Sequence, residues 1–168
     1  MKLRKQLLTA GVIAVILAIP RISNAGTATS SIAVSAIIPS TCTINAGALS
    51  FGTYNSNSGT AVAGTSTITV NCNLLAAYTV SLSKGSASAY NPRTMSMTSG
   101  GTTYTLNYDI YTDVAHTQIW GDGTSSTNTE AGVGTGLNQT LTAYGQIPAA
   151  QAGAVGTFND TVVATVSF

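Results

Sequence analysis

Short runs of alternating apolar and polar residues recur along this chain, and turn sequences separate them. Residues 67–72, for example, place Ile68, Val70 and Cys72 on one side. A period of two predicts a β-strand with one buried face, and no run after Ala25 has the periodicity of a convincing amphipathic helix. Many short strands without helices predict an antiparallel β-sandwich or barrel. Further runs lie at 78–82, 102–112, 118–120, 137–147 and 157–168.

The segment 1–25 has the composition of a secretion signal. Lys2, Arg4 and Lys5 precede an apolar run from Leu7 to Ile19, and small residues around Ala25 suit cleavage. A membrane anchor is the alternative, but this run is shorter than the roughly 20 residues that a span needs. We therefore expect a mature chain that begins at Gly26 and is long enough for one domain with a substantial core.

The mature chain carries little charge. Its basic residues are Lys84 and Arg93, and its five acidic residues give a net charge of −3 (Asp109, Asp113, Asp122, Glu130 and Asp160). This balance argues against a basic patch that binds nucleic acid or an anionic membrane. No later segment is apolar enough to span a membrane, and we predict no cofactor and no metal site.

Cys42 and Cys72 are the only cysteines, and both remain after export. An even pair in an exported chain predicts a disulfide. A zinc site needs more ligands than two cysteines and one histidine, and a redox pair is more often spaced CxxC. We expect a disulfide across this separation to stabilise the fold by about 3.5 kcal/mol.

The stretch Thr27–Ile38 alternates most clearly. Ile32, Val34, Ala36 and Ile38 share one side, and Pro39 ends the run. The pattern predicts a strand with one buried face, either the first strand of its own domain or a strand that fills a groove in a neighbouring copy. The closing strand, in which Val162, Ala164, Val166 and Phe168 share a side, offers an edge that invites pairing with another strand.

The sequence contains few residues that could form a catalytic site. His116 is the only histidine, and Asp113 and Ser125 lie near it in sequence, but a triad is defined by geometry. We interpret Asp113 as a turn residue and His116 as an exposed side chain, and we predict that the protein is not an enzyme. Residues 132–136 read as a flexible surface loop. Trp120, beside Gly121–Asp122–Gly123, packs at the sandwich edge or caps a sugar site.

Two long runs carry a family resemblance. The run YGQIPAAQAGAVGTFNDTVVATVSF (144–168) and the run LNYDIYTDVAHTQIWGDGT (106–124) resemble the signatures of the spore coat protein U-like domain of archaic, Csu-type chaperone–usher pilus subunits. Shorter matches are LSFGTY (49–54), YTVSLSKG (78–85), and Arg93 with Met95. These matches are spread in order over nearly the whole mature domain.

The resemblance implies an incomplete immunoglobulin-like sandwich that lacks its final strand. In such pilins a periplasmic chaperone lends a strand, and the amino-terminal extension of the next subunit replaces it at an outer-membrane usher. It therefore implies a secretion signal at 1–25, a donor extension at 26–40 and a pilin domain at 41–168. Ile32, Val34, Ala36 and Ile38 would be the groove-filling side chains, with Ala36 smaller than expected.

By the same resemblance the protein is a subunit of a surface fimbrium that supports adhesion and biofilm formation. Its partners would be other pilus subunits, the chaperone and the usher, and it would pass through the periplasm to the cell surface. Two other uses of the same domain stay open. One is a spore-coat or surface-layer protein, and the other is a sugar-binding adhesin module.

Overall fold

The computed structural model describes residues 25–168, so the expected secretion signal lies outside the described residues apart from Ala25. The described part divides into a segment that ends at Ile37 and a compact unit, Ile38–Phe168. Among the described residues, no helix is long and apolar enough to cross a membrane.

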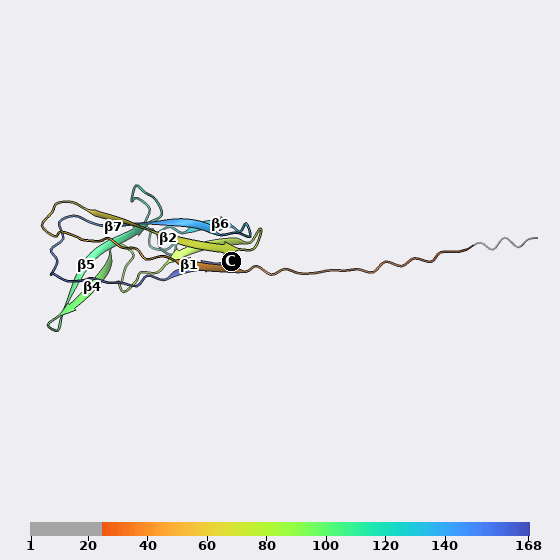
Figure 1. Cartoon of the computed structure of the whole chain (residues 1–168), viewed down its shortest axis with the longest axis horizontal. Coiled ribbons are helices and arrows are strands. Elements are labelled where there is room, and N and C mark those ends of the chain that lie inside the picture. The colour runs from red at the N-terminus through yellow and green to blue at the C-terminus, as the bar shows by residue number, and fades with distance from the viewer. Residues whose placement is uncertain (1–24) are drawn as a thin grey trace, which may run out of the picture. The chain divides into compact units, whose positions relative to one another are not determined.

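All regular structure in the described residues is β-structure, and every strand pairing is antiparallel, as the alternating runs predicted (Figure 1). Two sheets form, with the strand orders β1-β2-β7-β5-β4 and β6-β3-β8. The β4–β5 hairpin reaches out from the sandwich (Figure 1). The strands are β1 (Cys42–Ala46), β2 (Val62–Cys72), β3 (Ala77–Leu82), β4 (Arg93–Ser99), β5 (Thr102–Tyr111), β6 (Glu130–Val133), β7 (Gln139–Ile147) and β8 (Ala164–Ser167).

The core lies between the two sheets and is built from the alternating positions that the sequence marks. Ile68, Val70 and Cys72 of β2 are buried, and so are Tyr78, Val80 and Leu82 of β3, while their strand neighbours are more exposed. β5 contributes its own buried set, Leu106, Tyr108 and Ile110. These strand predictions are confirmed because the side-chain period of a strand places alternate residues on the core face.

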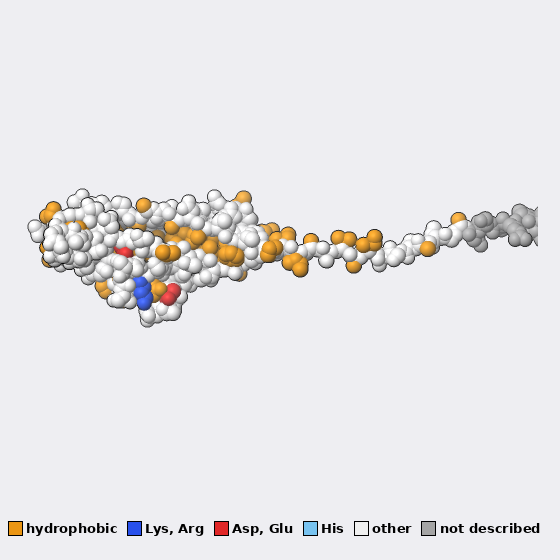
Figure 2. Space-filling view, turned by 90° about the horizontal axis from the view of Figure 1, so that it is seen from below, with side chains coloured by type: hydrophobic (Ala, Val, Ile, Leu, Met, Phe, Trp, Pro, Cys, Tyr) orange, Lys and Arg blue, Asp and Glu red, His pale blue; other side chains and the backbone are white. Residues whose placement is uncertain are grey.

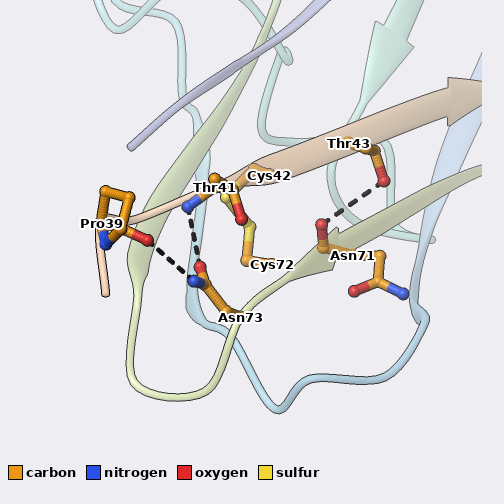
Figure 3. Close-up of a disulfide and its surroundings, with 7 residues drawn as sticks. All are labelled: Pro39, Thr41, Cys42, Thr43, Asn71, Cys72 and Asn73. Atoms are coloured by element: carbon orange, nitrogen blue, oxygen red, sulfur yellow. Dashed lines mark hydrogen bonds between the residues drawn. A yellow bond between two sulfur atoms is a disulfide. The ribbon is translucent and has the colours of Figure 1, made fainter. Parts of the chain in front are cut away.

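The predicted disulfide is confirmed. Cys42 and Cys72 lie directly opposite each other in the β1–β2 pairing, and their sulfur atoms are bonded. Beside them the Asn73 side chain accepts a 2.8 Å hydrogen bond from the Thr41 amide and donates one of 2.9 Å to the Pro39 carbonyl (Figure 3). The point at which the chain enters β1 is therefore held on both sides of Ser40.

Three expectations need correction. Residues 132–136 are not simply a loop, because β6 runs to Val133 and pairs with β3. Gly132 lets the Tyr78 ring lie against this strand, since a Cβ there would come within 2.5 Å of the ring. Trp120 is not at the edge but fully buried, with its indole nitrogen donating to the Val80 carbonyl at 3.0 Å. A buried ring cannot stack on a sugar.

The third correction concerns Thr27–Ile38. The structure assigns no strand to residues 25–41, and Ile32 and Val34 are 87% and 90% exposed. A strand is stable only when its backbone groups pair with a neighbour and its apolar face is covered. In this structure the segment therefore does not form the strand that its alternation predicts.

Candidate functional site

An open groove of about 810 Å³ lies along the compact unit, Ile38–Phe168. Its floor is made by core side chains from both sheets, among them Ile68, Leu82, Leu106, Ile110, Ala143 and Ile147. Figure 2 shows the resulting stripe of hydrophobic side chains on the surface of this unit. A groove that reaches the core of a sandwich is the form expected where one strand of the sandwich is absent.

The two walls of the groove are irregular segments beside edge strands. One wall, residues 46–54, follows β1, which is the edge strand of the larger sheet. The other wall, residues 153–162, precedes β8, which is the edge strand of the smaller sheet. Because an edge strand has unpaired N–H and C=O groups on one side, both edges can accept a further strand.

The first wall packs on two glycines of the larger sheet. A Cβ at Gly145 would come within 2.7–2.9 Å of Leu49 and Phe51, and a Cβ at Gly64 would meet the Ser50 carbonyl at 2.8 Å. The first wall can therefore pack this closely on the larger sheet only because Gly64 and Gly145 have no side chains. The Phe51 ring meets Tyr108 edge-on, with ring centroids 6.0 Å apart.

Hydrogen bonds fix the connection between β7 and β8, which leads into the second wall. The Gln151 side chain accepts from the Asn107 amide at 2.8 Å and donates to the Asn107 carbonyl at 2.9 Å, as a paired strand residue would. The Tyr54 hydroxyl donates to the Pro148 carbonyl at 3.1 Å and accepts from the Gln151 amide at 2.9 Å. The first wall and β5 are thus both tied to the connection that leads into the second wall.

Asp160 is the only charged residue among the described residues that line the groove. Its carboxylate accepts hydrogen bonds from the Tyr108 hydroxyl at 2.6 Å, the Ser86 amide at 2.9 Å and the Thr161 amide at 2.8 Å. Burial by itself would raise the pKa of Asp160, but these hydrogen bonds outweigh burial and lower it. Burial and Asp160 together raise the pKa of Tyr108, so the two groups stay a carboxylate and a phenol at neutral pH.

The structure brings together part of the predicted site. Val162 and Ala164 line the groove, and Val166 is half-buried against the core opposite Val80. Phe168 is more exposed, and β8 is shorter than the predicted run 157–168. The predicted donor residues Ile32, Val34, Ala36 and Ile38 are all exposed.

Sequence reasoning did not identify Asp160, Tyr108 or Gln151 as site residues. Asp160 lies in the sequence FNDT (158–161), within the run 144–168 that carries the family resemblance. The motif does not reveal that Asp160 meets a tyrosine 52 residues away. Such pairing depends on the sheet arrangement, which short-range patterns do not report.

Asp113 and His116 have separate structural partners. The Asp113 carboxylate accepts from the Thr117 hydroxyl and amide and from the Gln118 amide, which closes a turn and lowers the pKa of Asp113. This arrangement matches the interpretation of Asp113 as a turn residue. The His116 ring packs edge-on against Tyr111, with centroids 5.1 Å apart. His116 is therefore half-buried, and its interpretation as an exposed side chain needs correction.

The fold is that of a known class of β-sandwich. It is similar to a chain in the crystal structure of the CsuC–CsuE chaperone–tip adhesion subunit pre-assembly complex from archaic chaperone-usher Csu pili of Acinetobacter baumannii. The TM-score is 0.56 and the identity 23%, over 78% of this chain and 40% of that chain. This likeness supports the predicted incomplete immunoglobulin-like sandwich.

The chain belongs to the Spore Coat Protein U domain family, whose model matches residues 28–165. It is also 40% identical over 72 residues to Protein U of Myxococcus xanthus, a match that covers 43% of this chain and 39% of that protein. The chain thus spans about two fifths of the length of each of these relatives. The family match confirms the resemblance that the two long sequence runs carry, and it includes most of the exposed segment before Cys42.

Proposed function

We propose that this chain is a structural subunit of a surface pilus that polymerises by donor-strand complementation. In this proposal residues 26–40 of one copy form the missing strand of another, residues 41–168 are the acceptor domain, and residues 1–25 are the secretion signal. One observation carries it: the same chain has a groove with an apolar floor between two edge strands, and an exposed alternating segment that pairs with no strand among the described residues.

The floor of the groove and the exposed segment are chemically complementary. Ile32, Val34 and Ile38 are large aliphatic side chains on one side of the segment, and burying each would contribute roughly 1.5–3 kcal/mol. Pairing with an edge strand would add main-chain hydrogen bonds, each worth about 0.5–1.5 kcal/mol net. Strand addition is an established mode of recognition, and chaperone–pilin complementation is a known example.

The same groove explains which partners we expect. Before assembly, its apolar floor needs cover, because an exposed apolar surface with open strand edges promotes aggregation. We propose that a periplasmic chaperone supplies this cover and that an outer-membrane usher exchanges it for the next subunit. A role of the fibre in adhesion and biofilm formation is a further part of the proposal.

The test is the double variant Ile32→Asp/Val34→Asp, with Ala33→Asp/Ser35→Asp as the matched control on the opposite side of the segment. We expect the first pair to abolish polymers and to leave an acceptor domain that still folds, because two carboxylates cannot enter an apolar groove. The control pair should still polymerise. Polymers are read from boiling-resistant ladders on gels and from electron microscopy of the cell surface.

Normal polymers from the Ile32→Asp/Val34→Asp variant would refute strand donation. The segment would instead complete its own domain if the wild-type chain is a monomer and the same variant has a lower thermal unfolding temperature than wild type.

A second candidate use is a spore-coat or surface-layer protein. The observation that favours it is the similarity to Protein U, together with membership of the Spore Coat Protein U domain family. Electron microscopy of the native cell surface separates the two, since a pilus subunit appears in fibres and a coat subunit in a continuous layer. Strand donation can operate in a pilus and in a coat. The variants above therefore test how the subunits assemble, and the microscopy tests which assembly they form.

A further inference from the structure

The wall of the groove that leads into β8 contains one charged residue, Asp160. Its alternate residues from Val162 onward are Val162, Ala164, Val166 and Phe168, and the preceding residue on that side is Asp160. Val162, Ala164 and Val166 pack against the core, whereas Asp160 brings a carboxylate to the same lining. An apolar strand laid along Asp160–Phe168 therefore meets one charged residue, at Asp160.

Asp160 is held rigidly and keeps spare acceptor capacity. The Tyr108 hydroxyl and the amides of Ser86 and Thr161 donate hydrogen bonds to it, and an ionised carboxylate offers about four acceptor sites. Gly85, in a left-handed conformation at a φ of 66°, leaves no room for a side chain beside this carboxylate. When a strand fills the groove, Asp160 loses water on that side and needs a donor opposite it.

The exposed segment supplies such a donor at the matching position. Read backwards, its alternate residues are Ser40, Ile38, Ala36, Val34 and Ile32. Read forwards, the alternate residues of 160–168 are Asp160, Val162, Ala164, Val166 and Phe168. When the two strands run in opposite directions, the Ser40 hydroxyl lies opposite the Asp160 carboxylate. The small Ala36 then lies opposite the small Ala164, and large apolar residues lie opposite each other at the other positions.

We infer that Asp160 sets the register of the inserted strand by accepting a hydrogen bond from Ser40 of the neighbouring copy. The inference rests on the proposed function and specifies its site. Asp160 acts here as a positioning residue: a shift by two residues would set Ile38 or a residue beyond Ser40 against the carboxylate and break the matched alternation.

The antiparallel direction follows from where the two ends lie. The chain enters the compact unit at the disulfide, where Asn73 holds Pro39 and Thr41 (Figure 3). The last residues of β8 lie near this same end, because Ser167 pairs with Thr79 near the start of β3. Asp160 precedes Ser167 by seven residues, about 23 Å of extended chain. Copies that add head to tail therefore bring Ser40 of one to Asp160 of the next.

The test maps the register with cysteine pairs in polymers of the full mature chain, produced in the native host. A donor variant Ala36→Cys is co-produced with an acceptor variant, either Ala164→Cys or Val166→Cys. Directly opposed Cβ atoms lie about 4.5–5.5 Å apart and can be trapped as a disulfide, whereas diagonal ones are farther apart. We expect Ala164→Cys to give the cross-link in excess, on the order of tenfold.

The same cross-links are then measured with Asp160 or Ser40 altered. Asp160→Ala and Ser40→Ala should reduce the excess several-fold, because the register loses its polar match. Asp160→Asn should keep it, since an amide oxygen still accepts a hydroxyl. Ser30→Ala, which removes the serine beyond the other end of the apolar run, is the matched control and should leave the pattern unchanged.

The outcomes separate the two proposals. A dominant cross-link to Val166→Cys, or sensitivity to Ser30→Ala in place of Ser40→Ala, would overturn this register and leave strand donation in place. Unchanged cross-linking in Asp160→Asn, Asp160→Ala and Ser40→Ala would remove Asp160 as the determinant. If wild-type chains form no polymers and no cysteine pair links two copies, strand donation itself fails. Should Asp160→Ala not fold, Ser40→Ala still decides, because it leaves the acceptor groove intact.

Discussion

The guanidinium Nη2 of Arg93 donates a 2.6 Å hydrogen bond to the carbonyl oxygen of Trp120, in the interior of the sandwich. Its Nε donates to the Ser83 carbonyl at 3.1 Å, and the Tyr90 ring lies 5.3 Å from the guanidinium carbon. Arg93 thus links β4 to the segment after β3 and to the segment that carries the buried tryptophan. The side chains of Arg93 and Trp120 are both fully buried. The Arg93 contacts therefore join parts of the core that the sheet ladders do not connect.

Replacing Arg93 with Met should lower the free energy of unfolding by roughly 3–5 kcal/mol, because the buried Trp120 carbonyl and the partly buried Ser83 carbonyl lose their donor. Urea unfolding of the mature chain, followed by tryptophan fluorescence, measures this. Lys84→Met is the matched control, since it removes a cation that lies over the same Tyr90 ring but makes no buried hydrogen bond. Equal effects of the two variants would contradict a structural role for the Arg93 contacts.

Removing the disulfide with Cys42→Ala/Cys72→Ala should lower the free energy of unfolding by about 3.5 kcal/mol. The bond joins residues whose sequence separation is 30 and restricts the unfolded chain. The measurement is equilibrium denaturation of variant and wild type. Wild-type protein unfolded under reducing conditions should lose a similar amount, and a difference below about 1 kcal/mol would show that this crosslink does not stabilise the fold as the loop-entropy model expects.

The stability of the fold should fall as the pH rises through about 6, owing to Asp109. Burial raises the pKa of Asp109 to about 6, although the backbone amide and the charge of Arg93 oppose the shift. A pKa raised in the folded state favours the protonated form there. This contribution is therefore complete below the unfolded pKa of 3.8 and is lost between about pH 4 and 6.

The variant Asp109→Asn isolates this effect. Its amide oxygen can still accept from the Arg93 amide, but it does not titrate. Wild type should lose about 2–3 kcal/mol relative to the variant between pH 4 and 7, as measured by thermal or urea unfolding. Parallel pH profiles for the two proteins would contradict a raised pKa at Asp109.

Replacing Gly132 with Ala should destabilise the fold by about 1–3 kcal/mol, since the new methyl group overlaps the buried Tyr78 ring. Gly59→Ala is the control, because a Cβ there meets nothing within 4 Å. The control should stay within about 0.5 kcal/mol of wild type in urea unfolding. A similar loss in both variants would mean that the close approach of Tyr78 to β6 does not matter.

Local patterns predicted the strands whose two faces differ most. β2, β3 and β5 were predictable because alternate residues are strongly apolar and point into one core. β4 and β6 were not predicted, because Ser, Thr, Gly and Met give little contrast between faces. β6 becomes a strand by pairing with β3, and two further strands separate these neighbours along the chain.

Trp120 shows the same limit at the level of one residue. A tryptophan beside a glycine-rich turn suggested an edge or a sugar-binding surface. Trp120 is buried in the structure, where both of its polar groups have partners. Its indole nitrogen donates a hydrogen bond to the Val80 carbonyl of β3, and its backbone carbonyl accepts one from Arg93. Neither partner is near Trp120 in the sequence, so only the packed sheets bring these groups together.

The sequence by itself determined that the chain is all-β, that its two cysteines pair, and that Thr27–Ile38 carries one apolar side. These properties follow from residue spacing and composition, which act locally. Only the tertiary structure decided that this segment has no strand partner among the described residues, that the groove reaches the core, and that Asp160 is the charged residue in the described lining of the groove. Those features depend on which strand edges remain open after the two sheets pack, and that is settled by pairings between residues far apart in the chain.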